Sequence, residues 1–139
     1  MSAGYSGKPL VEKLGIKEGQ RIAILNSPKG YASVLGSLPR MVRQYTRLSA
    51  EFDFIQFFGT DHDELEKRFP ALKKSVAPSG MLWVSWPKGS SNITSTLSEN
   101  IVRRIGLNNG LVDVKVCAVD DVWSGLKFVF RIKDRQRSS

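Results

Sequence analysis

Apolar residues gather in five segments along the chain, which are residues 21–26, 52–58, 81–86, 112–119 and 126–132. Segments 21–26 and 81–86 are almost continuously apolar, which is typical of strands buried on both faces of a parallel sheet. Segments 112–119 and 126–132 partly alternate between apolar and polar positions, and only six residues separate them. We therefore expect the last two to form an antiparallel hairpin at the edge of the sheet, where one face is less buried.

Helical patterns lie between these segments. Residues 61–77 are expected to form a helix with Thr60 or Asp61 as its N-cap. Lysines near its C-terminal end suit the helix dipole, and Pro70 within it predicts a kink or a break. Residues 96–99 and residues 98–101 both look like the start of a second helix, and Thr96 and Glu99 have the spacing of a capping box. Shorter elements are expected as helix over 98–107, 31–38 and 9–14, and as strand over 45–48.

The alternation of strands and helices predicts the fold class. Strands joined through helices form right-handed crossovers and a parallel sheet covered on both faces. We therefore expect a three-layer, Rossmann-like α/β fold with a mostly parallel sheet and a C-terminal antiparallel hairpin at its edge. Residues 1–132 are predicted to form one domain, and residues 133–139 a basic, flexible tail.

Charge and composition narrow the classes of function. The 139 residues carry a net charge of +8, which favours contact with polyanions, but the charges are scattered along the chain as expected for solvated surfaces. Cys117 and His62 are the only cysteine and histidine, so neither an internal disulfide nor a zinc site is expected. No apolar stretch approaches the roughly 18 residues of a membrane span, and the first residues lack a secretory pattern. The chain is predicted to be cytoplasmic and to have no membrane partner.

Residues 72–84, Leu-Lys-Lys-Ser-Val-Ala-Pro-Ser-Gly-Met-Leu-Trp-Val, resemble one part of a known fold. They are similar to the helix, Pro-Gly turn and fifth strand in the C-terminal half of class I methyltransferases, which also end in an antiparallel pair of strands. The front half departs from that family. The cofactor loop of that family is glycine-rich, whereas residues 26–31 of this chain contain one glycine and Pro28. In addition, no acidic residue that could bind the ribose hydroxyls is identifiable after the next strand.

A second resemblance covers nearly the whole chain. The sequence looks like a bacterial family known only as a domain of unknown function, so this resemblance implies no activity. The segments that carry it are residues 3–10, 14–17, 25–31, 82–88, 112–120 and 122–127.

The candidate site lies where strand ends converge. In an open parallel sheet the ligand crevice forms beyond the carboxyl ends of the strands, which here are followed by residues 26–30, 59–61 and 86–92. Turn formation alone also explains many of these residues. As ligand-binding residues we expect Lys29 and Lys88 for charge, Asn26 for hydrogen bonding and Trp86 for stacking.

The residues form no pattern of nucleophile, base and orienting group, so we expect no catalytic residues and no metal ligands, and the sequence identifies no cofactor. The favoured function is a non-enzymatic, Rossmann-like domain that binds a small anionic or nucleotide-type ligand, or a protein partner, at the strand ends. Two alternatives stay open. One is a shortened methyltransferase-like enzyme that uses S-adenosylmethionine, and the other is a basic nucleic-acid-binding protein.

Overall fold

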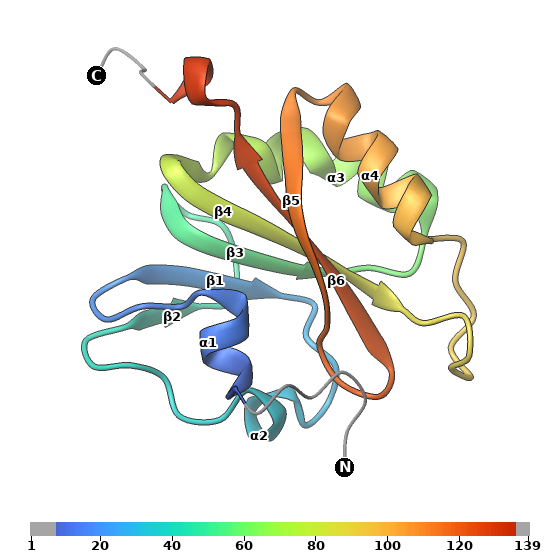
Figure 1. The fold of residues 1–139 in the computed structure, drawn as a ribbon, viewed down its shortest axis with the longest axis horizontal. Helices are drawn as coiled ribbons and strands as arrows, with labels where there is room; N and C mark the ends of the chain where they lie inside the picture. The colour runs from blue at the N-terminus through green and yellow to red at the C-terminus, as the bar shows by residue number, and fades with distance from the viewer. Residues whose placement is uncertain (1–7, 136–139) are drawn as a thin grey trace.

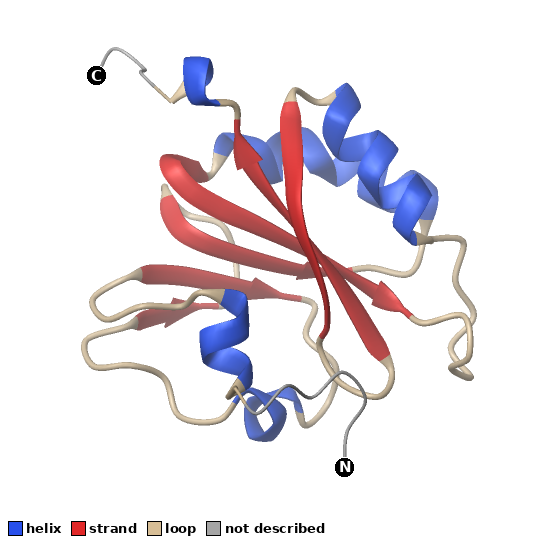
Figure 2. Cartoon of the chain, in the orientation of Figure 1, coloured by secondary structure: helices blue, strands red, loops and turns tan. Residues whose placement is uncertain are grey.

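A six-stranded sheet runs through the centre of the protein, and Figure 1 and Figure 2 show helices on both of its faces. The computed structural model describes residues 8–135. The strands are β1 (Arg21–Leu25), β2 (Arg43–Tyr45), β3 (Phe52–Phe58), β4 (Val76–Pro87), β5 (Leu111–Ala118) and β6 (Trp123–Phe130). Their order is β2-β1-β3-β4-β6-β5, in which the first four are parallel and β6 is antiparallel to both of its neighbours. The predicted fold class, with its hairpin at the edge of the sheet, is confirmed.

Two hydrophobic cores lie on opposite faces of the sheet. The helices are α1 (Leu10–Leu14), α2 (Tyr31–Leu35), α3 (His62–Lys74) and α4 (Glu99–Asn108). Side chains of α1 and α2 pack with Trp83 and Trp123 on what we call the α1–α2 face. Side chains of α3 and α4 pack with Phe57 and Phe128 on the α3–α4 face. Both faces are therefore covered, as continuous apolar strands require.

The third apolar segment forms a longer strand than expected. Strand β4 begins at Val76, so the predicted Pro-Ser-Gly turn lies inside the strand, where its register with β3 shifts. Gly80 is needed there, because a Cβ atom would lie 2.9 Å from the carbonyl oxygen of Asp53. The turn of the C-terminal hairpin is shorter than expected, since Trp123 already belongs to β6.

A crossover without a helix joins β2 to β3. The strand predicted over 45–48 begins two residues earlier and is shorter, as Arg43–Tyr45, and residues 46–51 return directly to the start of β3. Arg21 holds this crossover: its guanidinium carbon lies 4.2 Å from the ring centroid of Tyr45 and 4.7 Å from that of Phe52. The same side chain donates hydrogen bonds to the Glu51 carbonyl (3.1 Å) and the Ser49 hydroxyl (3.0 Å). One arginine thus connects three segments of backbone.

The N-cap predicted for α3 is observed, whereas the capping box predicted for α4 is not. Asp61 caps α3 by accepting from the Glu64 amide, and α3 continues through Pro70 without a break. The predicted capping box is wrong: Ser98, not Thr96, caps α4 by accepting from the Ile101 amide. Thr96 instead accepts a hydrogen bond from the His62 amide at the start of α3, a contact between distant segments that local spacing cannot reveal.

A short turn follows β6 and includes the first residues of the predicted tail. Residues Ile132–Asp134 form a 3-10 turn, and Arg135 Nε donates to the Phe130 carbonyl at 2.9 Å. The remainder of the predicted tail, residues 136–139, lies outside the described residues, as does the resembling segment at residues 3–7. In the part of the chain that is described, no helix has the length and apolar character of a membrane span.

We predict that Gly106→Ala destabilises the protein by about 1–3 kcal/mol, because a Cβ atom on α4 would overlap the ring of Phe128 in the sheet. This steric cost outweighs the roughly 1 kcal/mol that alanine gains over glycine in a helix. The control is Gly89→Ala, since a Cβ atom added at Gly89 would have no neighbour within 4 Å. Urea unfolding measures both variants, and an equal midpoint for Gly106→Ala and wild type would contradict the tight helix–sheet contact.

Candidate functional site

Three loops follow the parallel strands β1, β3 and β4 at the same edge of the sheet. They are residues 26–30, 59–61 and 88–92, which together we call the strand-end rim. The loops are joined to their surroundings by backbone hydrogen bonds, from Gly59 to Ser85 (2.9 Å) and from Lys88 to Val122 (2.7 Å). The edge predicted from the sequence as the ligand site is thus a set of anchored loops.

Asn26 turns the chain sharply at the end of β1. Its φ of 58° and the φ of 83° at Gly30 are both left-handed, a conformation that asparagine tolerates and glycine adopts freely. The Asn26 side chain is exposed, and its Nδ2 atom donates to the Phe58 carbonyl at 3.4 Å, at the end of β3. This bond leaves the second Nδ2 hydrogen and the Oδ1 acceptor of the amide for other partners.

Lys29 and Lys88 stand on different loops of the rim. Lys29 is exposed and Lys88 is half-buried, and neither forms an ion pair with any residue in the range 8–135. The strands that precede them, β1 and β4, have β3 between them, so the strand spacing sets the two loops roughly 10 Å apart. Two flexible ammonium groups at this spacing suit an extended anion rather than a single small ion.

Trp86 does not lie at the rim surface, and the prediction that its ring faces the crevice is wrong. The residue is only 5% exposed and packs in the core of the α3–α4 face with Leu97 and Val84. The sequence shows that Trp86 and Val84, which are two positions apart, share one face of β4. It does not show that the segment leading into α4 covers that face. The indole is therefore unavailable for stacking on a ligand.

A buried chain of hydrogen bonds runs beneath the rim. The Tyr31 hydroxyl donates to Gln56 Oε1 at 2.7 Å, and Gln56 Nε2 donates to the Ser85 hydroxyl at 3.1 Å. Gln56 and Ser85 are both completely buried, and burial raises the pKa of Tyr31, so its hydroxyl stays protonated as a donor. The chain links α2, β3 and β4 just below their loops. Its signals in the sequence are two polar residues, Gln56 and Ser85, each inside an apolar run.

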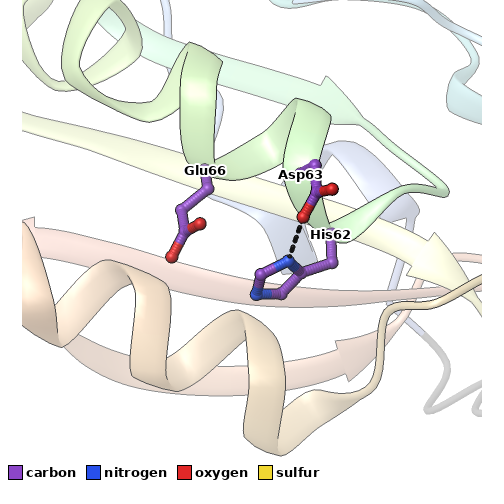
Figure 3. A group of neighbouring side chains, drawn as sticks. All are labelled: His62, Asp63 and Glu66. Carbon is purple, nitrogen blue, oxygen red and sulfur yellow. Dashed lines mark hydrogen bonds and ion pairs between the residues drawn. The ribbon is translucent and has the colours of Figure 1, made fainter.

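One group of possible metal ligands lies at the start of α3, as Figure 3 shows. His62 Nδ1 lies 2.8 Å from Asp63 Oδ1, a hydrogen bond that raises the pKa of the imidazole, and Glu66 is on the next turn. The ligand atoms lie within 4.8 Å of one another. The side chains of His62 and Asp63 are 38% and 93% exposed, so packing does not hold them in the fixed geometry of a metal site. A surface ion pair explains this arrangement.

The residues around β1 and β2 do not fit an S-adenosyl group in the manner of the methyltransferase family. Strand β2 ends at Tyr45 and is followed by Thr46 and Arg47, so no carboxylate stands ready to accept from ribose hydroxyls. Between α2 and the two strands lies a cavity of about 110 Å³. Small-molecule pockets usually measure about 300–1,000 Å³.

No protein-family model matches the sequence, and no curated protein matches it. The fold is similar to solved methyltransferases. A SAM-dependent methyltransferase from Aquifex aeolicus is 16% identical with a TM-score of 0.62, and the match covers 86% of each chain. Magnesium protoporphyrin IX methyltransferase from Synechocystis with bound SAM is 13% identical with a TM-score of 0.61, over 88% of this chain and 74% of that one. A TehB-like methyltransferase from Corynebacterium glutamicum is 12% identical with a TM-score of 0.57, over 93% and 91%.

These similarities establish the fold: the chain has a Rossmann-like, methyltransferase-type architecture. The fold-level resemblance seen at residues 72–84 is thereby confirmed, and it extends to the front half, where the sequence pattern departs from the family. The resemblance to a bacterial domain of unknown function stays a prediction. A shared fold does not transfer an activity, which depends on the side chains of the site.

We predict that Tyr31→Phe destabilises the protein by about 1–3 kcal/mol, because it leaves Gln56 Oε1 buried without its donor. Tyr45→Phe is the matched control. In the described part of the chain the Tyr45 hydroxyl has no hydrogen bond, so its loss should change stability by less than about 0.5 kcal/mol. Denaturant unfolding compares the two variants. Equal stabilities would mean that the buried chain contributes nothing to holding the rim.

Proposed function

We propose that this chain is a shortened methyltransferase-like protein whose strand-end rim binds a small anionic ligand of nucleotide type. The proposal rests on one observation, that Asn26, Lys29 and Lys88 are accessible on anchored loops at the carboxyl ends of the parallel strands. Ligands of α/β proteins bind at this edge, because the loops and helix starts there present donors to a common crevice.

Each residue has a distinct part in this proposal. Lys29 and Lys88 supply positive charge from two loops, which suits a phosphate or carboxylate group. The Asn26 amide is oriented by its bond to the Phe58 carbonyl and offers its remaining donor and acceptor to a polar group of the ligand. No aromatic stacking is assigned, since Trp86 is buried. Binding therefore depends on charge and hydrogen bonds.

Methyl transfer is the second candidate function. It is favoured by the fold, which the chain shares with methyltransferases, among them one with bound SAM and DhpI in complex with SAH. The segment at residues 45–47 argues against the usual mode of cofactor binding, because an arginine stands where a carboxylate would be needed. We therefore assign no catalytic step to the rim residues, and S-adenosyl compounds enter as ligands to be tested.

We predict that an adenine nucleotide binds the wild-type protein saturably and raises its melting temperature. A ligand present at about 100 times its Kd stabilises the folded state by about 2.7 kcal/mol. Lys88→Glu should weaken binding at least tenfold, because it places a negative charge beside the anion, while the melting temperature without ligand stays nearly unchanged. Thermal shift and calorimetry against ATP, AMP, S-adenosylmethionine and S-adenosylhomocysteine measure this.

The matched control is Lys67→Glu, the same charge reversal at an exposed position of α3. It should bind nucleotide as the wild type does. Equal weakening by both substitutions would reduce the effect to net charge and contradict a site at the rim. Binding of S-adenosyl compounds alone would replace our proposal with the methyltransferase candidate, and no binding of any compound would reject both.

A further inference from the structure

Lysines gather on the α1–α2 face of the hairpin, beside the end of α1. They are Lys13 in α1, Lys17 just after it, Lys115 in β5 and Lys127 in β6, which together we call the lysine cluster. Lys115 and Lys127 are directly paired across the two strands. Lys127 is also paired with Trp83 of β4, whose indole Nε1 donates to the Leu14 carbonyl at 2.8 Å. Figure 1 shows α1 lying in front of the sheet next to β5 and β6.

Two of these lysines attach α1 to the hairpin. Lys13 Nζ donates to the Ala118 carbonyl and Lys115 Nζ donates to the Lys13 carbonyl, both at 3.0 Å. The Lys115 bond satisfies a carbonyl in the last turn of α1, where intrahelical partners end. An ammonium group has three donor hydrogens, and this bond uses one of those of Lys115. The two contacts fix the position of the cluster relative to the sheet.

Lys127 has no such role. It is half-buried and forms no hydrogen bond or ion pair with any of residues 8–135. Burial lowers the pKa of Lys127, and the positive charges of Lys115 and Lys17 lower it further, with no carboxylate acting in the opposite direction. Like charges directly opposite each other on paired strands destabilise a sheet. Among residues 8–135, no carboxylate therefore neutralises the Lys127 ammonium, which is paired across the strands with Lys115.

The nearby thiol does not balance this charge. Burial raises the pKa of Cys117, which outweighs the opposite effect of Lys13 and Lys115. Cys117 is therefore a neutral thiol at physiological pH. Since neither this thiol nor a carboxylate of residues 8–135 balances the charge of Lys127, an anion from solution would be a favourable partner.

We propose that Lys115, Lys127 and Lys17 form a binding site for the phosphate group of a small phosphorylated ligand. The Cβ atoms of directly paired residues lie about 4.5–5.5 Å apart, so two lysines on the same face can donate to different oxygens of one tetrahedral phosphate. Lys17 follows α1 in the chain, is exposed, and adds a third positive charge that acts on Lys127. The site lies about 13 Å from the rim, because Trp83 precedes Pro87 by four positions along β4. It is independent of the function proposed for the rim.

Inorganic phosphate and pyrophosphate are the probes, and sodium chloride at matched ionic strength is the reference. We expect each phosphate to raise the melting temperature of the wild type saturably, and pyrophosphate to shift the amide resonances of β5 and β6 in NMR titrations. Lys127→Met should weaken pyrophosphate binding at least tenfold, while Lys127→Arg should retain it. Lys127→Met is expected to fold, with a melting temperature without ligand equal to or above that of the wild type, because it removes the repulsion and keeps the apolar stem.

Lys67→Met, which removes a charge on the exposed surface of α3, is the matched control and should bind as the wild type does. An equal stabilisation by sodium chloride would show that salt only screens the repulsion, and this result would overturn the proposal. Retention of pyrophosphate binding in Lys127→Met would overturn it as well. A single-stranded oligonucleotide is a further probe. If it binds equally well to the wild type and to Lys127→Met, while pyrophosphate binds to neither, the positive charge of the protein binds polyanions at another surface. This result would reject the phosphate site.

Discussion

The amide of Gln56 is the constraint on which the strand-end rim depends. It lies on β3, an inner strand of the sheet, with no exposed surface, so its polar atoms must find partners within the protein. One partner, Tyr31, is the first residue of α2, and the other, Ser85, is in β4. Any shift of α2 along the sheet would break a buried bond. The polar chain therefore fixes where the loop after β1 ends and α2 starts, which apolar packing alone specifies less strictly.

Much of the fold was predictable because its signals are local. Continuous apolar runs identified the buried strands, and partial alternation identified the edge hairpin, since each pattern records how many faces of a strand are covered. The predictions that proved wrong concern residues whose environment depends on contacts between distant segments. Thr96 bonds to the start of α3 instead of capping α4, and Trp86 packs in the same hydrophobic core as Leu97. The period of a strand tells which residues share a face, but not which element covers that face.

The strand-end rim and the lysine cluster also differ in how far local sequence patterns reveal them. Lys29 and Lys88 follow strand ends, so the topology of a parallel sheet was enough to select them as candidates. The environment of Lys127 could not be inferred from the apolar segment 126–132 in which it lies, because an isolated lysine in an alternating strand normally points to water. Its pairing with Lys115 on the α1–α2 face leaves it half-buried, and no carboxylate of residues 8–135 offsets the lowering of its pKa. Register and helix docking, which single-sequence patterns do not specify, decide its environment.

The shortness of the β2–β3 crossover connects the fold to the chemistry of the site. Six residues return the chain to the start of β3, and Arg21 stacks on two aromatic rings to hold them. From residue 19 to residue 50 the sequence contains arginines and lysines but no aspartate or glutamate. This part of the protein therefore keeps the strand positions of a methyltransferase fold while presenting only positive charge. A ligand group that needs a carboxylate partner is disfavoured beside these residues, and a group that carries negative charge is favoured, because the side chains and not the fold decide what a site binds.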